Sequence, residues 1–359
     1  MNRNDIEQLV RPNIRELKPY RSARDDFGSG TLLDANENAW GAPVPNRLNL
    51  HRYPVPVHAQ LRQKVASFRG VEPDSVFFGN GSDEPIDLLV RIFCKPGVDA
   101  IVTTPPTYGM YKVSARINDV NVIEIPLTEE FELRTEEILA QASEATKILF
   151  LCSPNNPTAN DLDRASILKL VELFPGIVVV DEAYIDFSRQ ESMAPMVQQY
   201  PNLVVLQTFS KSFGMAGARL GIAFAGPEIL SWMMKVKPPY NINKLTSDIA
   251  LQAFEKLDLI RINLDMIRKE QVRLSKELAA NPAVVKVFRS DANFLLFRIP
   301  KAHEAYQKLA EKGIIVRYRG NEPLCENCLR VTVGLPDEND RFLRLLENIT
   351  SSGTETDQP

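Results

Sequence analysis

Cysteine and histidine are scarce in this chain, whose 359 residues contain four cysteines and three histidines. Four cysteines in a chain of this length do not make a disulfide framework, which favours a reducing compartment such as the cytoplasm. Cys325 and Cys328 have the spacing of a metal-binding or redox pair, but a structural zinc site needs four ligands. Cys94 and Cys152 stand in apolar segments, and the histidines show no ligand spacing. We therefore expect no metal site and interpret Cys325 and Cys328 as free thiols in a loop.

Long apolar runs and an excess of positive charge are also missing. No apolar run approaches the roughly 20 residues that a membrane-spanning helix needs, and residues 1–12 lack the apolar centre of a signal peptide. The formal net charge is −4, which gives no argument for nucleic acid or an anionic membrane as a partner. These features point away from membrane and nucleic-acid functions and agree with a cytoplasmic location.

The middle of the chain alternates strand-like and helix-like segments. Helical patterns, such as the one at 164–174, separate apolar runs that read as buried strands, at 100–103, 148–152, 177–181, 203–207 and 221–225. This alternation predicts an α/β fold with a mostly parallel sheet and helices on both of its faces.

The last third of the chain has a different pattern, which predicts a smaller α+β domain. Long helical periodicity at 249–254 and 257–278 precedes strand-like runs at 294–299, 314–317 and 329–333, with helices at 305–312 and 337–349. A short amphipathic helix is expected near the amino end, stopped by Pro12. We expect an amino-terminal arm (1–30), a large domain (31–240), a small domain (241–350) and a disordered tail (351–359). The arm is expected to pack with the small domain.

The most informative segment is TFSKSFGMAGAR at residues 208–219. It places Lys211 straight after a strand-like run, with Ser210 beside it and Arg219 eight residues later. An amine that attacks a carbonyl needs a lowered pKa and a fixed position, and a hydroxyl with a guanidinium suits a phosphate. An attacking lysine beside an anion site is what pyridoxal 5'-phosphate requires. The alternative for this segment alone is a solvated lysine at a helix end.

Two strand-like runs end in polar residues that suit the same cofactor. The run at 177–181 ends in Asp181, and the run at 148–152 leads into a turn, SPNNPT, that contains Asn156. Because ligands bind beyond the carboxyl ends of strands in open α/β sheets, Asp181 could pair with a protonated pyridine nitrogen. Tyr184 and Asn156 could then hydrogen-bond the phenolic oxygen of the ring. The alternatives are a helix-capping aspartate and ordinary turn chemistry.

A glycine-bearing segment, VFFGNGSDEP at residues 76–85, leads into a helical pattern with one apolar face. The free N–H groups at the start of such a helix bind phosphate. Ser82 stands at this start and would add a hydroxyl, but it is equally an ordinary N-cap.

Together these segments resemble the fold-type I pyridoxal-phosphate enzymes, and they follow one another in that superfamily's order. In that order an aromatic residue follows the glycine-bearing segment, and here it would be Tyr108. Five short motifs are similar to those of the histidinol-phosphate aminotransferases: PYRSAR (19–24), LDANEN (33–38), RYPVP (52–56), IIVR (314–317) and CLRVTVG (328–334). The resemblance covers residues 10–346. It implies a large domain with a mostly parallel seven-stranded sheet, a smaller α+β domain, and a homodimer.

The resemblance also implies which residues bind the cofactor. Lys211 forms the Schiff base with pyridoxal phosphate and moves the proton between the substrate and cofactor carbons. Asp181 keeps the pyridine nitrogen protonated, and Tyr108 stacks on the ring. Tyr184 and Asn156 bind the ring oxygen. The cofactor phosphate is held by Ser82, Asp83 (through its backbone), Ser210, Arg219 and Tyr53 of the partner subunit.

For the substrates, the resemblance implies transamination of L-histidinol phosphate with 2-oxoglutarate in histidine biosynthesis, giving imidazole-acetol phosphate and L-glutamate. Arg330 grips the α-carboxylate of the amino acid through a bidentate contact. Tyr20 and Arg317 hold the phosphate of histidinol phosphate, and Asn36 lies near the substrate. Histidinol phosphate has no α-carboxylate whereas glutamate has one, so the arginines must meet either a carboxylate or a phosphate dianion.

One position departs from the family pattern. Ala159 follows Thr158 where the family commonly has glycine. Because alanine does not easily adopt a positive φ, we expect either a right-handed backbone at Ala159 or a slightly shifted turn, which bears on the placing of Asn156.

Three other functions stay open from the sequence. A threonine-phosphate decarboxylase also handles an amino-acid phosphate, and an aromatic-amino-acid aminotransferase would accept a phenyl ring in an imidazole-sized pocket. A pyridoxal-phosphate-sensing module without catalysis is the third. Such regulators usually carry a DNA-binding domain, for which no basic segment is present before residue 30. The presence of Lys211, Asp181 and both arginines favours turnover.

Overall fold

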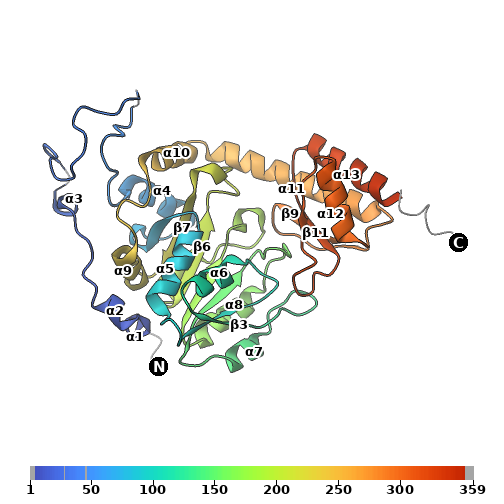
Figure 1. The fold of residues 1–359 in the computed structure, drawn as a ribbon, viewed down its shortest axis with the longest axis horizontal. Coiled ribbons are helices and arrows are strands. Elements are labelled where there is room, and N and C mark those ends of the chain that lie inside the picture. Colours follow the sequence, from blue (N-terminus) through green and yellow to red (C-terminus); the bar gives the residue numbers. More distant parts are fainter. Residues whose placement is uncertain (1–4, 28, 45–46, 352–359) are drawn as a thin grey trace.

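The computed structural model describes residues 5–27, 29–44 and 47–351 and contains two sheets joined by a long helix (Figure 1). The larger sheet has the order β1-β7-β6-β5-β4-β2-β3. β7 runs antiparallel to both of its neighbours, whereas β6, β5, β4, β2 and β3 pair in parallel. This confirms the predicted mostly parallel seven-stranded sheet. Its strands are β1 (Val76–Asn80), β2 (Ala100–Thr103), β3 (Asn121–Glu124), β4 (Thr146–Cys152), β5 (Ile177–Asp181), β6 (Leu203–Thr208) and β7 (Leu220–Ala225).

The central strands form because their side chains are apolar on both faces. In β5, Val178 and Val180 belong to one hydrophobic cluster, while Ile177 and Val179 belong to the cluster on the opposite face. One face is covered by α4 (Ala59–Arg69), α7 (Thr135–Ala140), α8 (Arg164–Leu173) and α10 (Lys244–Phe254). The other is covered by α5 (Asp83–Phe93), α6 (Met110–Ile117) and α9 (Pro227–Val236). Two covered faces explain why these strands read as continuous apolar runs.

The smaller sheet is antiparallel and has the order β10-β11-β9-β8. It packs with three helices around a separate apolar cluster, which confirms the predicted smaller α+β domain. The 24-residue helix α11 (Leu257–Ala280) leads to it from the large sheet (Figure 1). Its elements are β8 (Lys286–Val287), β9 (Phe294–Arg298), α12 (Ala302–Glu311), β10 (Arg317–Tyr318), β11 (Cys328–Thr332) and α13 (Pro336–Ser351). The exact domain boundaries stay a prediction.

The start of the amino-terminal arm packs against the large sheet's helices, so the expected packing with the small domain is wrong for residues 5–15. Ile6, Leu9 and Ile14 join the apolar cluster under α5 and α9. The Arg11 N–H donates to the Ile92 carbonyl at 3.0 Å, and Lys235 Nζ to the Arg15 carbonyl at 2.7 Å. The arm contains α1 (Ile6–Leu9), α2 (Pro12–Arg15) and α3 (Ala23–Asp26).

Pro12 ends the first short helix as expected but also begins the second, a position that suits proline. Short 3-10 turns lie elsewhere at Pro73–Ser75, Ile185–Phe187, Ala194–Gln198 and Ala216–Ala218. Of the tail expected to be disordered, residues 352–359 lie outside the described residues. None of the helices in the described part of the chain has the length and apolar character needed to cross a bilayer.

The four cysteines are free and buried. Cys328 is the first residue of β11, and its N–H donates to the Cys325 carbonyl at 2.9 Å across a tight turn. The interpretation of Cys325 and Cys328 as a loop pair is therefore wrong for Cys328. Across residues 5–27, 29–44 and 47–351 no cluster of histidine, cysteine and acidic side chains could hold a metal ion. The cytoplasmic location stays a prediction.

Candidate active site

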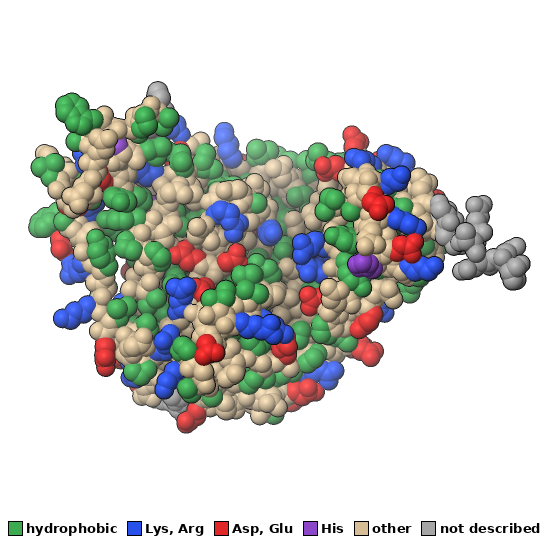
Figure 2. Space-filling model, in the orientation of Figure 1, with side chains coloured by type: hydrophobic (Ala, Val, Ile, Leu, Met, Phe, Trp, Pro, Cys, Tyr) green, Lys and Arg blue, Asp and Glu red, His purple; other side chains and the backbone are tan. Residues whose placement is uncertain are grey.

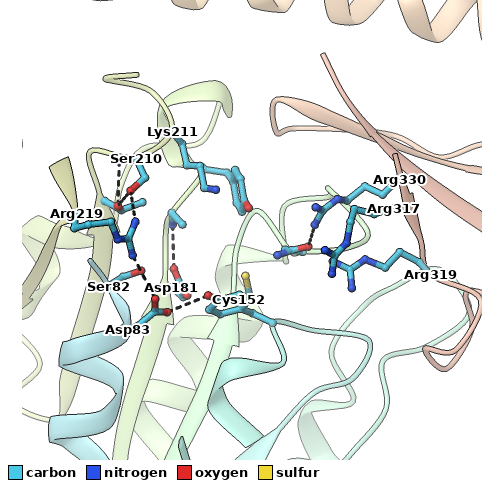
Figure 3. A pocket seen from close by; sticks show the side chains of 15 residues that line it. Ser82, Asp83, Cys152, Asp181, Ser210, Lys211, Arg219, Arg317, Arg319 and Arg330 are labelled. Atoms are coloured by element: carbon cyan, nitrogen blue, oxygen red, sulfur yellow. Dashed lines mark hydrogen bonds and ion pairs between the residues drawn. The ribbon is translucent and has the colours of Figure 1, made fainter. Parts of the chain in front are cut away.

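A cavity of about 290 Å³ opens where β4, β5 and β6 end, between the large and small sheets. Cys152 and Asp181, the last residues of β4 and β5, stand side by side in the parallel register. All the predicted cofactor and substrate residues line this cavity except Tyr20, Asn36 and Tyr53. Figure 3 shows Lys211 and Asp181 between two groups: Ser82, Ser210 and Arg219 on one side, and three arginines from the small sheet on the other.

Asp181 lies on the cavity floor with only 2% of its surface exposed. Its Oδ2 accepts a hydrogen bond from the Tyr111 hydroxyl at 2.7 Å, and its Oδ1 accepts one from the Ala183 N–H at 3.1 Å. Burial nevertheless raises the pKa of this carboxyl to about 6. A buried carboxylate of this kind is stabilised when a cation binds beside it, and a protonated pyridine nitrogen is such a cation.

The turn that follows β6 and carries Lys211 is held by two stacked aromatic rings. The rings of Phe209 and Phe213, which flank Lys211 at two residues on either side, stack with centroids 4.2 Å apart. The Lys211 Nζ lies 5.6 Å from the centre of the Tyr184 ring. Burial and the charges of Arg330 and Arg219 lower the pKa of Lys211. The lysine is therefore both fixed and biased toward its neutral, nucleophilic form.

The side of the cavity next to α5 is built to take an anion. Ser82 occupies the N-cap of α5, but its side chain makes no capping hydrogen bond, so its hydroxyl is not used as an ordinary cap. Arg219 Nη1 donates to the Ser210 hydroxyl at 3.4 Å, and Arg219 Nη2 lies 3.5 Å from Asp83 Oδ2. Helix N–H groups, two hydroxyls and a guanidinium together match the oxygens of a phosphate.

Two glycines allow the backbones around this anion site to approach each other. Gly81 has φ +70°, and a Cβ there would lie 2.4 Å from Arg219 Nη2. A Cβ on Gly221 would lie 2.1 Å from the carbonyl carbon of Gly81. Larger residues at either position would displace Arg219 or the loop before α5. The residues present thus fit the phosphate end of pyridoxal phosphate, with Asp181 and Lys211 placed for its ring nitrogen and aldehyde.

The opposite side of the cavity carries three arginines. Arg317 on β10 faces Arg330 on β11 in the antiparallel register, and Arg319 follows Arg317 by two residues. Arg330 Nη1 donates to Asn156 Oδ1, and the guanidinium carbon of Arg330 lies 5.0 Å from the centre of the Phe294 ring. Burial and the charge of Arg319 lower the pKa of Arg330 to about 10. Three cations gathered at one end of the cavity, of which Arg319 and Arg330 are half-buried, indicate a second anion site.

The family model for class I and II aminotransferases matches residues 32–346.
The chain belongs to this family.
Curated relatives include the histidinol-phosphate aminotransferases of Parabacteroides distasonis, which is 48% identical over 96% of this chain and 99% of the relative, and of Christiangramia forsetii, 46% identical over 96% and 98%. A solved histidinol-phosphate aminotransferase from Sinorhizobium meliloti, in complex with pyridoxal-5'-phosphate, superposes with a TM-score of 0.78. It is 20% identical, over 95% of this chain and 97% of that one, which shows a shared fold. The predicted family is confirmed.

Sequence reasoning missed one residue that lines the cavity of this aminotransferase, Arg319, and one that holds a cavity residue in place, Tyr111. Tyr111, fully buried and stacked on Phe150 with ring centroids 4.7 Å apart, holds Asp181. Arg319 lines the cavity beside Arg317. A signal for Arg319 was present, because side chains two residues apart on a strand point to the same face. Tyr111 gave no comparable signal, since its contact with Asp181 spans 70 residues of sequence.

Three predicted residues lie away from this cavity in the same chain. Tyr20 is 72% exposed. Tyr53 is 51% exposed and stacks on Tyr240, with ring centroids 4.9 Å apart. Asn36, with φ 51°, lines a separate hollow beside Tyr53. In the single chain, these three residues therefore lie outside the cavity.

Ala159 adopts the conformation that was not expected of it. Its φ is 70°, so the expected right-handed backbone at Ala159 is wrong. The Ala159 N–H donates to the Asn155 carbonyl at 2.8 Å, and the Ala159 carbonyl accepts from the Asp291 N–H at 2.7 Å. The left-handed conformation costs an alanine about 1–2 kcal/mol, which these bonds and full burial offset. Asn156 consequently lies in the cavity, as expected from the sequence.

Proposed function

We propose that this aminotransferase uses pyridoxal phosphate to transfer an amino group from L-histidinol phosphate to 2-oxoglutarate, giving imidazole-acetol phosphate and L-glutamate. The observation that carries the proposal is the position of Lys211 and Asp181 between two anion sites, one at α5 and one at the three arginines. One site suits the cofactor phosphate, and the other suits a substrate phosphate or carboxylate. The names of the curated relatives, at 46–48% identity, support the same substrate.

Bound pyridoxal phosphate supplies an aldehyde carbon that takes up the amino group and a cationic ring that withdraws electrons. Asp181, fixed by Tyr111 and the Ala183 N–H, would hold the proton on the ring nitrogen. Lys211, whose amine is biased toward its neutral form, would take the proton from the substrate carbon and deliver it to the cofactor carbon. Asp181 is buried at the end of β5, and Lys211 follows the end of β6.

The remaining residues would hold the cofactor and the substrates in place. Ser82, Ser210 and Arg219 would bind the cofactor phosphate. Tyr108 would lie against the ring, with its hydroxyl fixed by a 3.0 Å hydrogen bond to Asp83 Oδ1. Tyr184, whose pKa is raised by burial, would donate its hydroxyl proton to the ring oxygen.

Arg330 and Arg317 would receive the charged groups of both substrates in turn. Arg330 would bind the α-carboxylate of glutamate, and Arg317 the phosphate of histidinol phosphate or the distal carboxylate of glutamate. Asn156 accepts a hydrogen bond from Arg330 Nη1 through its Oδ1, and its side-chain N–H would donate to the cofactor ring oxygen. The same arginine pair can thus serve a phosphate ester without an α-carboxylate and an amino acid with one.

A half-reaction tests this function directly. The absorption band of the purified holoprotein should be replaced by that of the pyridoxamine phosphate form on titration with L-histidinol phosphate, and 2-oxoglutarate should restore it. L-phenylalanine and O-phosphothreonine serve as the comparison substrates. Release of carbon dioxide from O-phosphothreonine without conversion of histidinol phosphate would favour the decarboxylase, and a higher kcat/KM for phenylalanine would favour the aromatic aminotransferase.

We further propose a homodimer in which Tyr53 of the partner subunit completes each cavity, together with Asn36 and with Tyr20 of the amino-terminal arm. Tyr53 and Tyr20 are more than half exposed in the single chain. Large hydrophobic side chains are exposed in and just after this arm, among them Phe27, Leu33 and Trp40. Figure 2 shows hydrophobic side chains on the surface at its upper left, where this part of the chain lies in Figure 1. Such a patch on the surface of one chain is typical of an interaction site.

Mixed dimers test this arrangement. Lys211→Ala is expected to be inactive and Tyr53→Ala to bind the cofactor weakly, but a dimer of the two contains one cavity with both Lys211 and an intact Tyr53 of the partner subunit. At limiting cofactor, the co-expressed pair should therefore exceed the activity of Tyr53→Ala alone at equal concentration of that chain. A light-scattering mass of one chain, or no gain in the co-expressed pair, would contradict the proposal.

A further inference from the structure

Arg319 stands in line with the two arginines already assigned to substrate binding. It follows Arg317 by two residues, and its N–H donates to the Cys328 carbonyl at 2.9 Å, which continues the ladder between β10 and β11. Side chains at i and i+2 on such a ladder share one face, as do residues directly opposite each other. Arg317, Arg319 and Arg330 therefore point into the same end of the cavity, as Figure 3 shows.

The charge at this end of the cavity is not neutralised by the protein. Within the described part of the chain, no ion pair joins Arg317 or Arg330 to a carboxylate, and Arg319 has only Glu322, at 3.9 Å. The Nε atoms of Arg319 and Arg330 are buried and have no hydrogen-bond partner among the described residues. Unmatched buried donors and like charges destabilise a folded chain unless an anion binds them.

The groups facing Arg319 do not supply that anion. Arg317 and Arg330 carry the same charge. Tyr184 and Cys325 are neutral near pH 7, because burial raises the pKa of Tyr184 and a hydrogen bond with Cys328, together with burial, raises that of Cys325. Glu322 is separated by more than a normal hydrogen-bond length and keeps 34% of its side chain exposed. Burial and the charge of Arg317 accordingly lower the pKa of Arg319.

We propose that Arg319 is a specificity-determining residue that makes the arginine end of the cavity prefer a phosphate-monoester dianion to a carboxylate. A carboxylate carries one charge and two oxygens, which Arg317 can satisfy by a bidentate contact. A phosphate monoester carries almost two charges near pH 7 and three free oxygens, and the third oxygen and second charge call for another guanidinium. This inference rests on the proposed function, because it assigns the phosphate of histidinol phosphate to a site that glutamate also uses.

Binding of two small anions to the holoprotein tests the assignment. With pyridoxal phosphate bound, its own phosphate fills the site at α5, so added methyl phosphate should report on the arginine end. In Arg319→Gln the dissociation constant of methyl phosphate should rise about tenfold or more, since a charge-assisted hydrogen bond is lost. The constant for glutarate should rise less than about threefold, because Arg317 and Arg330 remain. Isothermal titration calorimetry gives both constants.

The pH dependence separates a charge effect from a change of shape. A phosphate monoester loses its second charge below a pKa of about 6, so the preference of the native protein for methyl phosphate should weaken from pH 7 to pH 5. That change should be smaller in Arg319→Gln and largely kept in Arg319→Lys, which retains the charge. Arg289→Gln, which removes an exposed arginine of the small domain paired with Asp291, controls for net charge and should match the native protein.

Equal losses for methyl phosphate and glutarate in Arg319→Gln, or no loss for either, would overturn the assignment. The melting temperature should not fall, because one cation leaves a crowded cationic cluster, so misfolding is recognisable as a separate event. The two proposals fail differently. If the native holoprotein does not convert histidinol phosphate, the proposed function fails; if it does and Arg319→Gln keeps the native preference, only the role of Arg319 fails.

Discussion

Replacement of Lys211 by alanine is expected to lower turnover by about 10⁴-fold or more while leaving the fold intact. The substitution removes both the amine that would bind the cofactor covalently and the only base assigned to the proton transfer at the substrate carbon. The fold should survive because the turn around Lys211 is held by the stacked rings of Phe209 and Phe213 rather than by the lysine. We expect kcat to collapse with little change in melting temperature.

Two measurements make this result specific to the cofactor. Borohydride reduction of the native holoprotein should fix the cofactor to the peptide that contains Lys211, found by its mass, and Lys211→Ala should give no such peptide. Lys169→Ala is the matched control, since Lys169 pairs with Glu136 on the outer surface of the large domain. Turnover in Lys211→Ala close to that of Lys169→Ala would refute the role assigned to this residue.

The strands that carry the site were the most predictable part of the fold. The predicted ranges 100–103 and 177–181 coincide with β2 and β5 because both strands are buried on two faces and so appear as unbroken apolar runs. β3, with the sequence NVIE, is an edge strand whose residues are exposed or half-buried, and it gives no such run. β10 was expected at 314–317 but begins at Arg317, because pairing with β11 rather than local apolar character defines it.

Residues of the site were predictable where one short segment carried the chemistry. Lys211, Ser210 and Arg219 lie within twelve residues of one another in sequence, and the strand before them fixes their place. Contacts that join distant segments were not predictable. The arm's position against α5 and α9 depends on which apolar surface is left uncovered, and a single amphipathic turn is compatible with either domain.

Replacement of Asp181 by asparagine should separate catalysis from cofactor binding. The amide keeps the shape of the side chain and can still meet the Tyr111 hydroxyl and the Ala183 N–H, but it no longer offers a negative charge to the ring nitrogen. We expect kcat to fall by about 10³-fold, the order found when one preorganised electrostatic contact is removed from a transition state. Cofactor affinity should fall far less, because Lys211, Ser82, Ser210 and Arg219 are unchanged.

Equilibrium dialysis for the cofactor and steady-state kinetics at saturating cofactor measure the two effects separately. Asp161→Asn is the matched control: Asp161 is also a buried carboxyl whose pKa is raised to about 6, but it bonds to the Ser188 hydroxyl and does not line the cavity. A loss of cofactor affinity as large as the loss of kcat in Asp181→Asn would argue against a role for this carboxylate in stabilising the cationic ring.

The same carboxyl predicts a pH dependence of stability in the cofactor-free protein. Burial raises the pKa of Asp181 from 3.8 to about 6, so between these values the folded chain holds a proton that the unfolded chain has lost. Stability therefore decreases as the pH rises from about 4 to 6. Asp181→Asn should lack this contribution, while buried neighbours such as Glu182 affect both proteins alike. Urea unfolding across this pH range measures the difference, and parallel curves for the two proteins would contradict it. Bound pyridoxal phosphate should abolish the difference in slope, because a cation beside the carboxylate favours its ionised form and removes the cost of burying it.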